Sequence, residues 1–359
     1  MRFAFSLHID YVRAMPLQRL NWSQRNYDAL NEFLAGVRPG ELAVFDWDNT
    51  CIFGDIGEAL FRHAALNLAF KFDAATLETM IPDSVNGVAS VIINQKPFPL
   101  DKMKEAIVAS YGELEAKTSH GGRIGFGDNY RIFTSGLLAL NKSLEETPGI
   151  GCEFAYPWVN GFLQGLTLTE FEQMATTVID QELRNPIRRH IRNDPRRRWR
   201  YEWTGGVRLY QEMKDLAAAW EDRGGAVVIS TASNRQLVEK MIAMTAFHCR
   251  RVIGMGPATA GNRFGLVLEL GLRPNLGTGK VANIRNLLKN EPVLVAGDSR
   301  NDYEMLSSFP STRMRLIVNR HAGGKIALLC RRALAGEKGY LAQEINPQQG
   351  EFKPENNLI

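Results

Sequence analysis

The feature that most limits the possible folds is an alternation of short apolar runs with helical segments in the second half of the chain. Five apolar runs are rich in β-branched residues and bounded by turn residues, so we predict buried strands there. From about residue 205 onward the runs alternate with helical patterns, which is typical of βαβ units in a parallel, doubly wound sheet. The predicted strands are Leu42–Asp46, Ala226–Ser230, Arg251–Met255, Val293–Asp298 and Arg315–Asn319.

A long insertion separates the first predicted strand from the second. It has about 180 residues, far more than a single crossover needs. Because its pattern is mostly helical and ligands of open α/β sheets bind at the carboxyl ends of strands, we predict a cap domain over the site. The expected cap helices are Ile56–Phe72, Leu100–Tyr111, Asn129–Leu144 and Thr169–Leu183, and helices of the second half are expected at Gln236–Ala246, Gly279–Lys289 and Asp302–Ser307.

The predicted fold class is therefore α/β, with a discontinuous core and an inserted, mostly helical cap. We place the core at 25–60 and 205–345 and the cap at 61–204. The polar residues 346–359 are predicted to form a loose tail.

Composition excludes several classes of protein. No apolar run approaches the roughly 18 residues that a membrane span needs, and a net charge of +4 is too small to indicate nucleic acid unless it is concentrated. His8 and Asp10 interrupt the N-terminal apolar residues, so the start is a poor signal peptide, although a misassigned start would leave a periplasmic or secreted location open. Four dispersed cysteines without a CxxC pair favour reduced thiols and the cytoplasm.

Chemically active residues lie at the ends of the predicted strands. Because a parallel sheet gathers its strand ends along one edge, we expect these side chains to converge there. The cluster would comprise four carboxylates, one lysine and two or three hydroxyls. Its members are Asp46, Asp48 and Thr50 in "FDWDNT", Ser230 and Thr231 in "VVISTASN", Lys280 in "GTGK", and Asp298 and Asp302 in "GDSRND".

Such a cluster suits phosphate chemistry. Four neighbouring acids require a hard cation, and Mg²⁺ takes oxygen ligands. A hydroxyl and an ammonium group can hold phosphate oxygens beside the metal. One carboxylate can attack phosphorus to form an acyl phosphate, while the second serves as general acid and then as general base.

The four motifs, in this order and spacing, resemble those of the haloacid dehalogenase-like (HAD) superfamily: DxDx[TV], a strand-ending Ser or Thr, a Lys, and GDxxxD. The resemblance implies a HAD-like fold, Mg²⁺ as cofactor and a role for each residue. Asp46 would be the nucleophile, Asp48 the general acid/base, and Lys280, Thr50, Ser230 and Thr231 the groups that bind phosphate, while Mg²⁺ would be held by Asp46, Asp298 and the backbone carbonyl of Asp48, with support from Asp302.

Competing motifs fail on single residues. "GTGK" would be a P-loop only with Gly at 274 and Ser or Thr at 281, where this chain has Pro274 and Val281. "GMG" at 254–256 lacks a third glycine at 259, so it is not a dinucleotide fingerprint. Superfamily members that cleave carbon–halogen bonds lack the second aspartate of the first motif, so the presence of Asp48 favours a phosphatase.

Within the superfamily, "DxDNT", "ISxA", "VIG", "LVAGD", "VNR" and "YPWVNGFLQGLTLTEF" resemble phosphorylcholine phosphatases and phosphoserine-phosphatase-like proteins. This resemblance implies that Asp55, nine residues after Asp46, meets a substrate ammonium group, as in phosphocholine, phosphoethanolamine or phosphoserine. A helix N-cap is an equally good interpretation of Asp55.

Two more features, one in the cap and one at a strand end, bear on the substrate. Tyr156 and Trp158 could enclose a quaternary ammonium by cation–π contact, although a place in the cap core is the commoner fate of such aromatic residues. After the second motif, where choline-type members carry acids, this chain has Asn234 and Arg235. An arginine near the pocket would disfavour a cationic headgroup.

Eight arginines lie between Arg184 and Arg200, beside Trp199, Tyr201 and Trp203. They could form a surface for RNA, phospholipid or a polyanionic substrate. A solvated segment of the cap is the favoured interpretation. The predicted function is a Mg²⁺-dependent phosphomonoesterase acting on a small phosphate ester; the alternatives are a phosphotransferase and a binding or regulatory protein that uses the segment 184–200.

Overall fold

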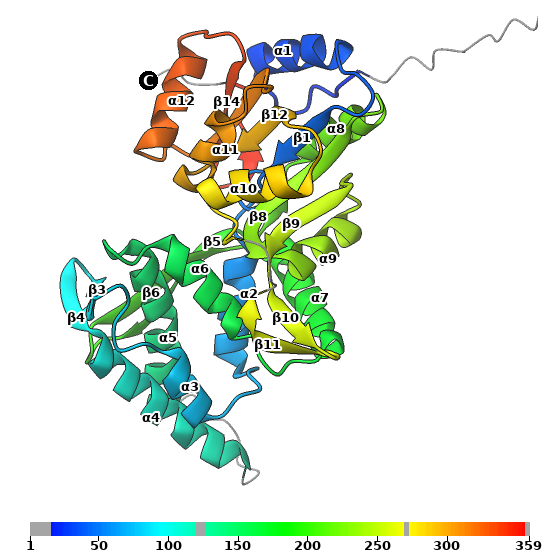
Figure 1. The fold of residues 1–359 in the computed structure, drawn as a ribbon. Coiled ribbons are helices and arrows are strands. Elements are labelled where there is room, and N and C mark those ends of the chain that lie inside the picture. The colour runs from blue at the N-terminus through cyan, green and yellow to red at the C-terminus, as the bar shows by residue number, and fades with distance from the viewer. Residues whose placement is uncertain (1–15, 120–126, 269–272, 356–359) are drawn as a thin grey trace, which may run out of the picture.

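The computed structural model describes residues 16–119, 127–268 and 273–355. The predictions for the N-terminal residues and for residues 356–359 therefore lie outside the described part of the chain. The molecule has two parts, a sheet-centred core and a mostly helical cap (Figure 1). None of the described helices is long and apolar enough to cross a membrane.

A seven-stranded sheet forms the centre of the core. Its order is β15-β14-β13-β12-β1-β8-β9, and the strands pair in parallel except for β14 with β15. All five predicted strands are present, which confirms the α/β fold class with a parallel sheet. The strands are β1 (Leu42–Phe45), β8 (Ala226–Asn234), β9 (Arg251–Met255), β12 (Pro292–Gly297), β13 (Met314–Asn319), β14 (Tyr340–Asn346) and β15 (Glu351–Phe352).

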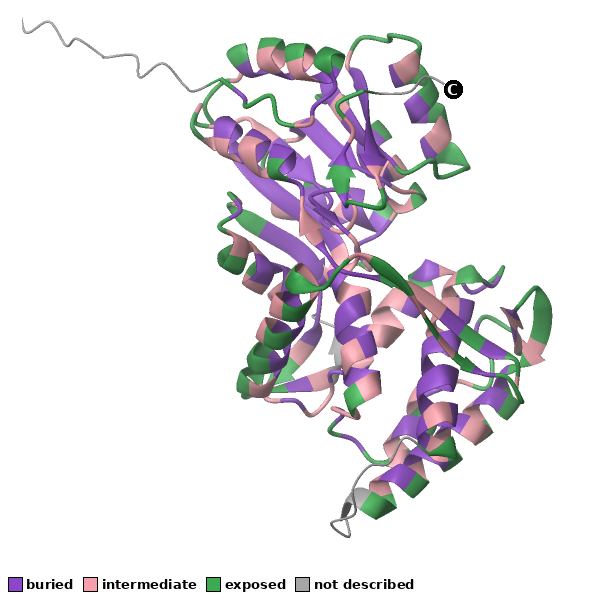
Figure 2. Ribbon diagram, turned by 180° about the vertical axis from the view of Figure 1, so that it is seen from behind, coloured by how far each residue is buried: buried purple, intermediate pink, exposed green. Residues whose placement is uncertain are grey.

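Helices cover both faces of this sheet. Along β1, Ala43 and Phe45 pack into one apolar cluster while Val44 packs into another, as alternate side chains of a strand must. The central strands are therefore buried on both faces, and their ribbons are mostly purple in Figure 2. One face carries α1 (Gln24–Ala35), α8 (Gln211–Glu221) and α9 (Arg235–Thr245); the other carries α10 (Thr278–Leu287), α11 (Tyr303–Ser307) and α12 (Lys325–Leu334).

The predicted loose tail is wrong as far as Phe352. The chain turns after Asn346 and returns as β15, which pairs antiparallel with β14. Phe352 is buried and its ring lies 4.3 Å from the ring of Tyr210 and 5.2 Å from that of Trp22. Burial of one aromatic side chain outweighs the polar character of its neighbours, which the composition of the tail did not reveal.

The cap is inserted after β1, as predicted, and is not only helical. Two hairpins accompany its helices, in agreement with the prediction of a mostly helical cap. The described cap elements are α2 (Ile56–Asn67), α3 (Ala74–Met80), α4 (Leu100–Ser119), α5 (Asp128–Glu146), α6 (Cys152–Gly161), α7 (Leu168–Arg184), β3 (Ser90–Ile93), β4 (Lys96–Pro99), β5 (Arg188–Asp194) and β6 (Trp199–Gly205).

The arginine-rich segment forms the β5–β6 hairpin. On β6 the buried Trp199 and Tyr201 alternate with Arg200 and Glu202, the period of a half-buried strand. Gly136 of α5 lies directly beneath: a Cβ atom there would meet the Trp199 ring at 2.7 Å. The hairpin thus packs closely on α5 through its aromatic side chains.

Two short antiparallel pairs connect core and cap. β2 (Ile52–Phe53) pairs with β7 (Arg208–Leu209), so the segments that enter and leave the cap lie side by side. β10 (Pro257–Ala260) and β11 (Arg263–Leu268) form a hairpin after β9, and Phe264 packs against Phe171 of α7 with ring centroids 5.0 Å apart. The exact limits of core and cap remain a prediction.

Candidate active site

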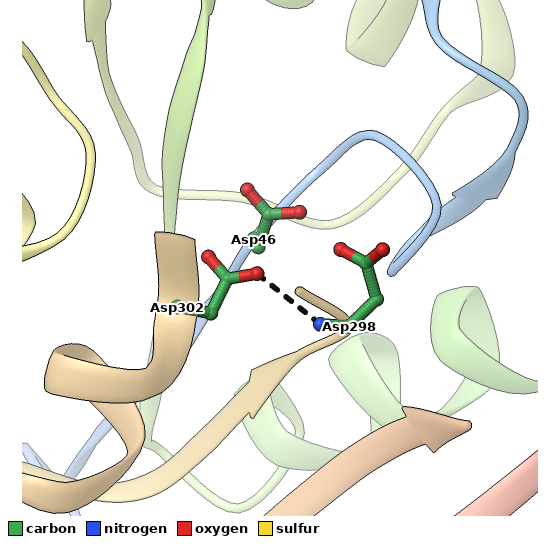
Figure 3. A group of neighbouring side chains, drawn as sticks. All are labelled: Asp46, Asp298 and Asp302. Atoms are coloured by element: carbon green, nitrogen blue, oxygen red, sulfur yellow. Dashed lines mark hydrogen bonds between the residues drawn. The ribbon is translucent and has the colours of Figure 1, made fainter. Parts of the chain in front are cut away.

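Three carboxylates meet where two neighbouring strands end (Figure 3). The register pairs Phe45 of β1 with Ala296 of β12, so Asp46 and Asp298 follow adjacent strand ends. Asp302 closes the short helix η1 (Arg300–Asp302) just after β12. One carboxylate oxygen from each residue lies within 4.8 Å of the others, and all three residues are buried.

Lys280 lies between two of these acids. Its Nζ donates to Asp46 Oδ1 at 2.5 Å and to Asp302 Oδ1 at 2.7 Å, and its side chain is 1% exposed. It enters from the first turn of α10. Lys280, predicted at the start of a helix, is therefore in direct contact with Asp46 at the end of β1 and with Asp302 after β12.

Asp302 also holds the loop that carries Asp298. Its Oδ2 accepts from the backbone N–H of Asp298 at 3.2 Å, the contact drawn in Figure 3, and from both the N–H and the hydroxyl of Ser299. Gly297 makes this approach possible, because a Cβ there would lie 2.5 Å from the Asp302 side chain. Asp302 thus positions both the lysine and the loop that carries Asp298.

The cluster has more negative charge than its lysine balances. Burial, with the nearby Asp302, raises the pKa of Asp46 to about 8 even though Lys280 opposes the shift. Burial and Asp302 likewise raise the pKa of Asp298 to about 7, against the opposing effect of Arg320, whose Nη1 donates to Asp298 at 2.8 Å. A further positive charge beside these carboxylates would lower the pKa of both Asp46 and Asp298.

A divalent cation fits this donor set. Three buried carboxylates within 4.8 Å offer the oxygen ligands that Mg²⁺ prefers, and their raised pKa values indicate an uncompensated negative site. The site is therefore compatible with the Mg²⁺ predicted from the sequence. The carboxylate of Asp48 does not belong to this group of three.

The Asp48 side chain instead points toward the end of β8. Its Oδ1 accepts from the backbone N–H of Ile56 at 2.8 Å, and its Oδ2 accepts from the Ser233 hydroxyl at 2.6 Å. Thr231 Oγ1 lies 3.5 Å from the same Oδ2. Burial and then the charge of Asp55 raise the pKa of Asp48 well above its usual value, although the Ser233 hydrogen bond opposes this.

Three predicted phosphate-binding residues, Thr50, Ser230 and Thr231, do not line the cavity beside these acids. The Ser230 hydroxyl is fully buried and accepts from Asn275 Nδ2 at 3.1 Å. Thr50 is also fully buried and donates to Asp298 Oδ1 at 3.3 Å. Ser233, three residues after the predicted Ser230, lines the cavity instead, because β8 extends beyond the predicted strand to Asn234.

A cavity of about 570 Å³ opens above the carboxylates, between core and cap. Asp46, Asp48 and Lys280 form its base. Its volume lies in the range of sites that enclose small organic ligands, roughly 300–1,000 Å³. The polar cap residues in its wall are Asp55, Glu58, Asn141, Lys142, Glu145, Glu146, Cys152, Tyr156 and Asn160.

Asp55 is the N-cap of α2, which confirms one of its two interpretations, and its contact with a substrate ammonium group stays a prediction. Its Oδ1 caps α2 by accepting from the Glu58 N–H at 2.7 Å, and the residue also lines the cavity. Burial and the neighbouring Glu58 raise its pKa to about 6. The Glu58 carboxylate in turn accepts from the Tyr201 hydroxyl at 2.7 Å.

Tyr156 and Trp158, the two aromatic residues that could enclose an ammonium group, have different surroundings. Tyr156 lines the cavity, and its hydroxyl lies 3.3 Å from Glu145 Oε1. Trp158 does not line the cavity; its Nε1 donates to the Met80 carbonyl at 2.7 Å and its ring packs on Phe162. The structure therefore does not form the Tyr156–Trp158 cage.

The argument from Arg235 against a cationic substrate is also corrected. Its guanidinium pairs with Glu239 at 3.1 Å on the surface of α9 and does not line the cavity. Asn234 does line it and caps α9.

Two cavity arginines were missed by the sequence reasoning. Arg300 lies in η1 within the fourth motif, and its Nη2 is 3.3 Å from Cys152 Sγ of the cap. Arg320 directly follows β13, a strand that was predicted, so the rule for strand ends could have found it. Lys142 and Glu145 of α5 also line the cavity, and no sequence pattern pointed to them.

The arginines of 184–200 are largely engaged within the cap. Arg189 and Arg200 pair with Glu202, Arg197 pairs with the buried Asp194 at 2.9 Å, and the Arg192 guanidinium lies 4.8 Å from the Tyr130 ring. These contacts favour a structural role over a polyanion surface.

Residues 152–307 match the family model for haloacid dehalogenase-like hydrolases. Among solved structures, a functionally unknown protein from Anaerococcus prevotii DSM 20548 is 24% identical, with a TM-score of 0.80 over 94% of this chain and 97% of that one. A protein of unknown function from Bordetella pertussis Tohama I is 14% identical, with a TM-score of 0.48 over 86% of this chain and 99% of that one. A substrate-bound phosphoserine phosphatase is 11% identical, with a TM-score of 0.35 over 79% and 87% of the two chains. No curated protein matches the chain in sequence.

The matched segment contains Lys280, Asp298 and Asp302 but begins after Asp46. The likeness to the Anaerococcus protein extends over core and cap, and shows that the whole fold recurs in another chain.

Proposed function

We propose that the protein hydrolyses phosphate monoesters through a phosphorylated Asp46, a proposal supported by the match of residues 152–307 to the haloacid dehalogenase-like hydrolases. The observation that carries this proposal is the contact of Lys280 with Asp46 and Asp302 at the base of a cavity that Asp48 also lines. Nucleophile, cation and proton donor thus face one enclosed space.

In the first step, an Asp46 carboxylate oxygen attacks phosphorus and the bond from phosphorus to the ester oxygen breaks. Lys280 orients Asp46 and compensates the charge of the phosphoryl oxygens. Mg²⁺, held by Asp46, Asp298 and the loop that Asp302 supports, would supply further charge compensation.

Asp48 would move the protons. Its raised pKa favours the protonated form that can donate to the departing alcohol oxygen. In the second step, the resulting carboxylate takes a proton from water, whose oxygen attacks phosphorus as the bond to Asp46 breaks. Ser233 and the Ile56 N–H keep the carboxyl group in place for both transfers.

For the alcohol part, we propose a group with a positive charge, as in phosphocholine, phosphoethanolamine or phosphoserine. Asp55 and Glu58 line the cavity near Asp48 and would attract an ammonium group. The cationic side chains of the lining have other partners: Arg320 donates to Asp298, Lys142 pairs with Glu145, and Arg300 contacts Cys152. Tyr156 is the aromatic residue placed to contact it. Transfer to an alcohol acceptor in place of water remains the second candidate activity, since the same groups would serve it.

The cytoplasm, predicted from the four cysteines, remains a proposed location.

The test is hydrolysis of p-nitrophenyl phosphate, phosphocholine, phosphoethanolamine and phosphoserine, with Mg²⁺ and with EDTA. We expect Mg²⁺-dependent release of phosphate that Asp46→Asn abolishes. Asp194→Asn makes the same change at a buried aspartate of the β5–β6 hairpin. It controls for a loss of activity that is caused by unfolding. Equal inactivity of wild type and Asp46→Asn on all four esters would refute the proposal.

A further inference from the structure

The cavity continues well beyond the catalytic groups, along one face of α2. Asp55 and Glu58 line it at the start of this helix, and Phe61 and Ala64 line it further on. Within the helix, the lining positions Gly57, Leu60, Phe61 and Ala64 recur every three or four residues and so lie on one side of it. At about 1.5 Å per residue, the lining extends roughly 13 Å from Asp55 to Ala64.

The character of the wall changes along this path. Near the start of α2 the lining is charged, whereas the far part is hydrocarbon. The Phe162 ring contacts two other phenylalanine rings there: its centroid lies 5.1 Å from that of Phe61 and 5.5 Å from that of Phe70. The apolar lining residues are Leu60, Phe61, Ala64, Phe70, Val159, Phe162 and Leu163.

The alcohols of phosphoethanolamine and phosphoserine are short and polar throughout. Seated with phosphorus at Asp46, they would reach Asp55 and Glu58 and leave the phenylalanine-lined part of the cavity to water. Apolar wall exposed to water is unfavourable, and its burial against hydrocarbon is favourable in proportion to the area covered.

We infer that the natural substrate is a phosphate monoester whose alcohol carries an apolar arm, alkyl or aromatic, extending along α2 beyond its polar end. This inference rests on the proposed function and narrows it. The polar part of the alcohol would lie beside Asp55 and Glu58, and the arm between Ala64 and Phe162.

A homologous series tests the arm directly. With Mg²⁺, kcat/KM is measured for ethyl, butyl, hexyl and octyl phosphate. Transfer of hydrocarbon from water into an apolar site predicts a rise of roughly 2- to 4-fold for each added methylene until the cavity is filled. Equal values across the series, with ethyl phosphate hydrolysed, would overturn the inference and leave the proposed function intact.

A matched pair of variants on α2 locates the effect. Ala64→Leu fills the apolar part of the cavity and should bring the ratio of kcat/KM for hexyl over ethyl phosphate close to 1. Ala59→Leu makes the same change on the opposite side of the helix, where Ala59 lines a separate cavity of about 230 Å³, and should retain the wild-type ratio. Equal ratios in both variants would overturn the placement of the arm.

Binding without turnover separates the two proposals. The thermal midpoint of the protein is measured with ethyl, butyl, hexyl and octyl phosphonate, which have no ester bond to cleave. Protection that increases with chain length and is lost in Ala64→Leu supports the arm even if every ester is inert, an outcome that would refute only the proposed hydrolysis. Inert esters together with protection independent of chain length would overturn both.

Discussion

Replacement of the proposed nucleophile, Asp46→Asn, should stabilise the metal-free protein while abolishing turnover. The side chain is buried beside Asp302 and Asp298, and these surroundings raise its pKa from the ordinary 3.8 to about 8. The folded state therefore favours the proton, and ionised Asp46 opposes folding. Asparagine has nearly the shape of the protonated acid and carries no charge.

The size of the effect follows from linkage. An acid whose pKa is raised on folding costs no stability below its unfolded pKa, and the cost grows as pH rises from about 4 to about 8. At pH 7 the shift corresponds to an upper limit of about 4 kcal/mol. Rearrangement of neighbouring side chains and water reduces this, so we expect a gain of about 1–3 kcal/mol in the free energy of unfolding at pH 7.

The measurement is urea unfolding of wild type and Asp46→Asn in EDTA at pH 4.5, 6.0 and 7.5. The stability difference should be near zero at the lowest pH and increase with pH. Saturating Mg²⁺ should stabilise the wild type more than the variant, because the variant lacks one carboxylate ligand.

Asp302→Asn is the matched control in the same cluster. Asp302 accepts from Lys280, from the Asp298 and Ser299 N–H groups and from the Ser299 hydroxyl, so its replacement removes favourable contacts. We expect this variant to be less stable than the wild type in EDTA. If Asp46→Asn is also less stable at pH 7.5, the cluster is not electrostatically strained and our reasoning is wrong.

Three other predictions concern separate contacts. Lys280→Met removes the cation between Asp46 and Asp302 and should cost about 3–5 kcal/mol in urea unfolding with EDTA; a cost below about 1 kcal/mol would contradict the buried pairing. Ser233→Ala removes the hydrogen bond that lowers the pKa of Asp48, so the alkaline limb of the kcat/KM profile should move to higher pH, and a move to lower pH would exclude Asp48 as the acid. Gly136→Ala places a Cβ against the Trp199 ring and should cost about 1–3 kcal/mol without changing KM; an unchanged thermal midpoint would show that the β5–β6 hairpin packs loosely on α5.

The sheet and the acids at its edge could be predicted because they obey local rules. The run ending at Asp46 is apolar and β-branched, and a parallel sheet leaves little choice about where its end lies. The same rule would have extended to Arg320 after β13. Ser230 was misplaced only because β8 extends to Asn234, which brings Ser233 to the cavity.

The β5–β6 hairpin shows a different kind of failure. The alternation in "WRYEW" is that of a half-buried strand, with Trp199 and Tyr201 on the packed side. The number of arginines drew attention to charge, although their partners Glu202, Asp194 and Tyr130 lie within the cap. Side-chain periodicity was the better indicator of structure than composition.

The cavity depends on packing between helices, which no strand-end rule describes. Its walls come from α2, α5 and α6, and only the assembled cap brings Glu145 and Phe162 to the same space as Asp55. α2 contacts both Asp48 and the apolar part of the cavity. Its N-terminus is held by the Ile56 N–H on Asp48, while its later turns line the apolar part of the cavity. A shift of α2 along its axis would therefore move the apolar wall and the proton donor together, so that the fit of the alcohol and the position of Asp48 are set by one rigid element.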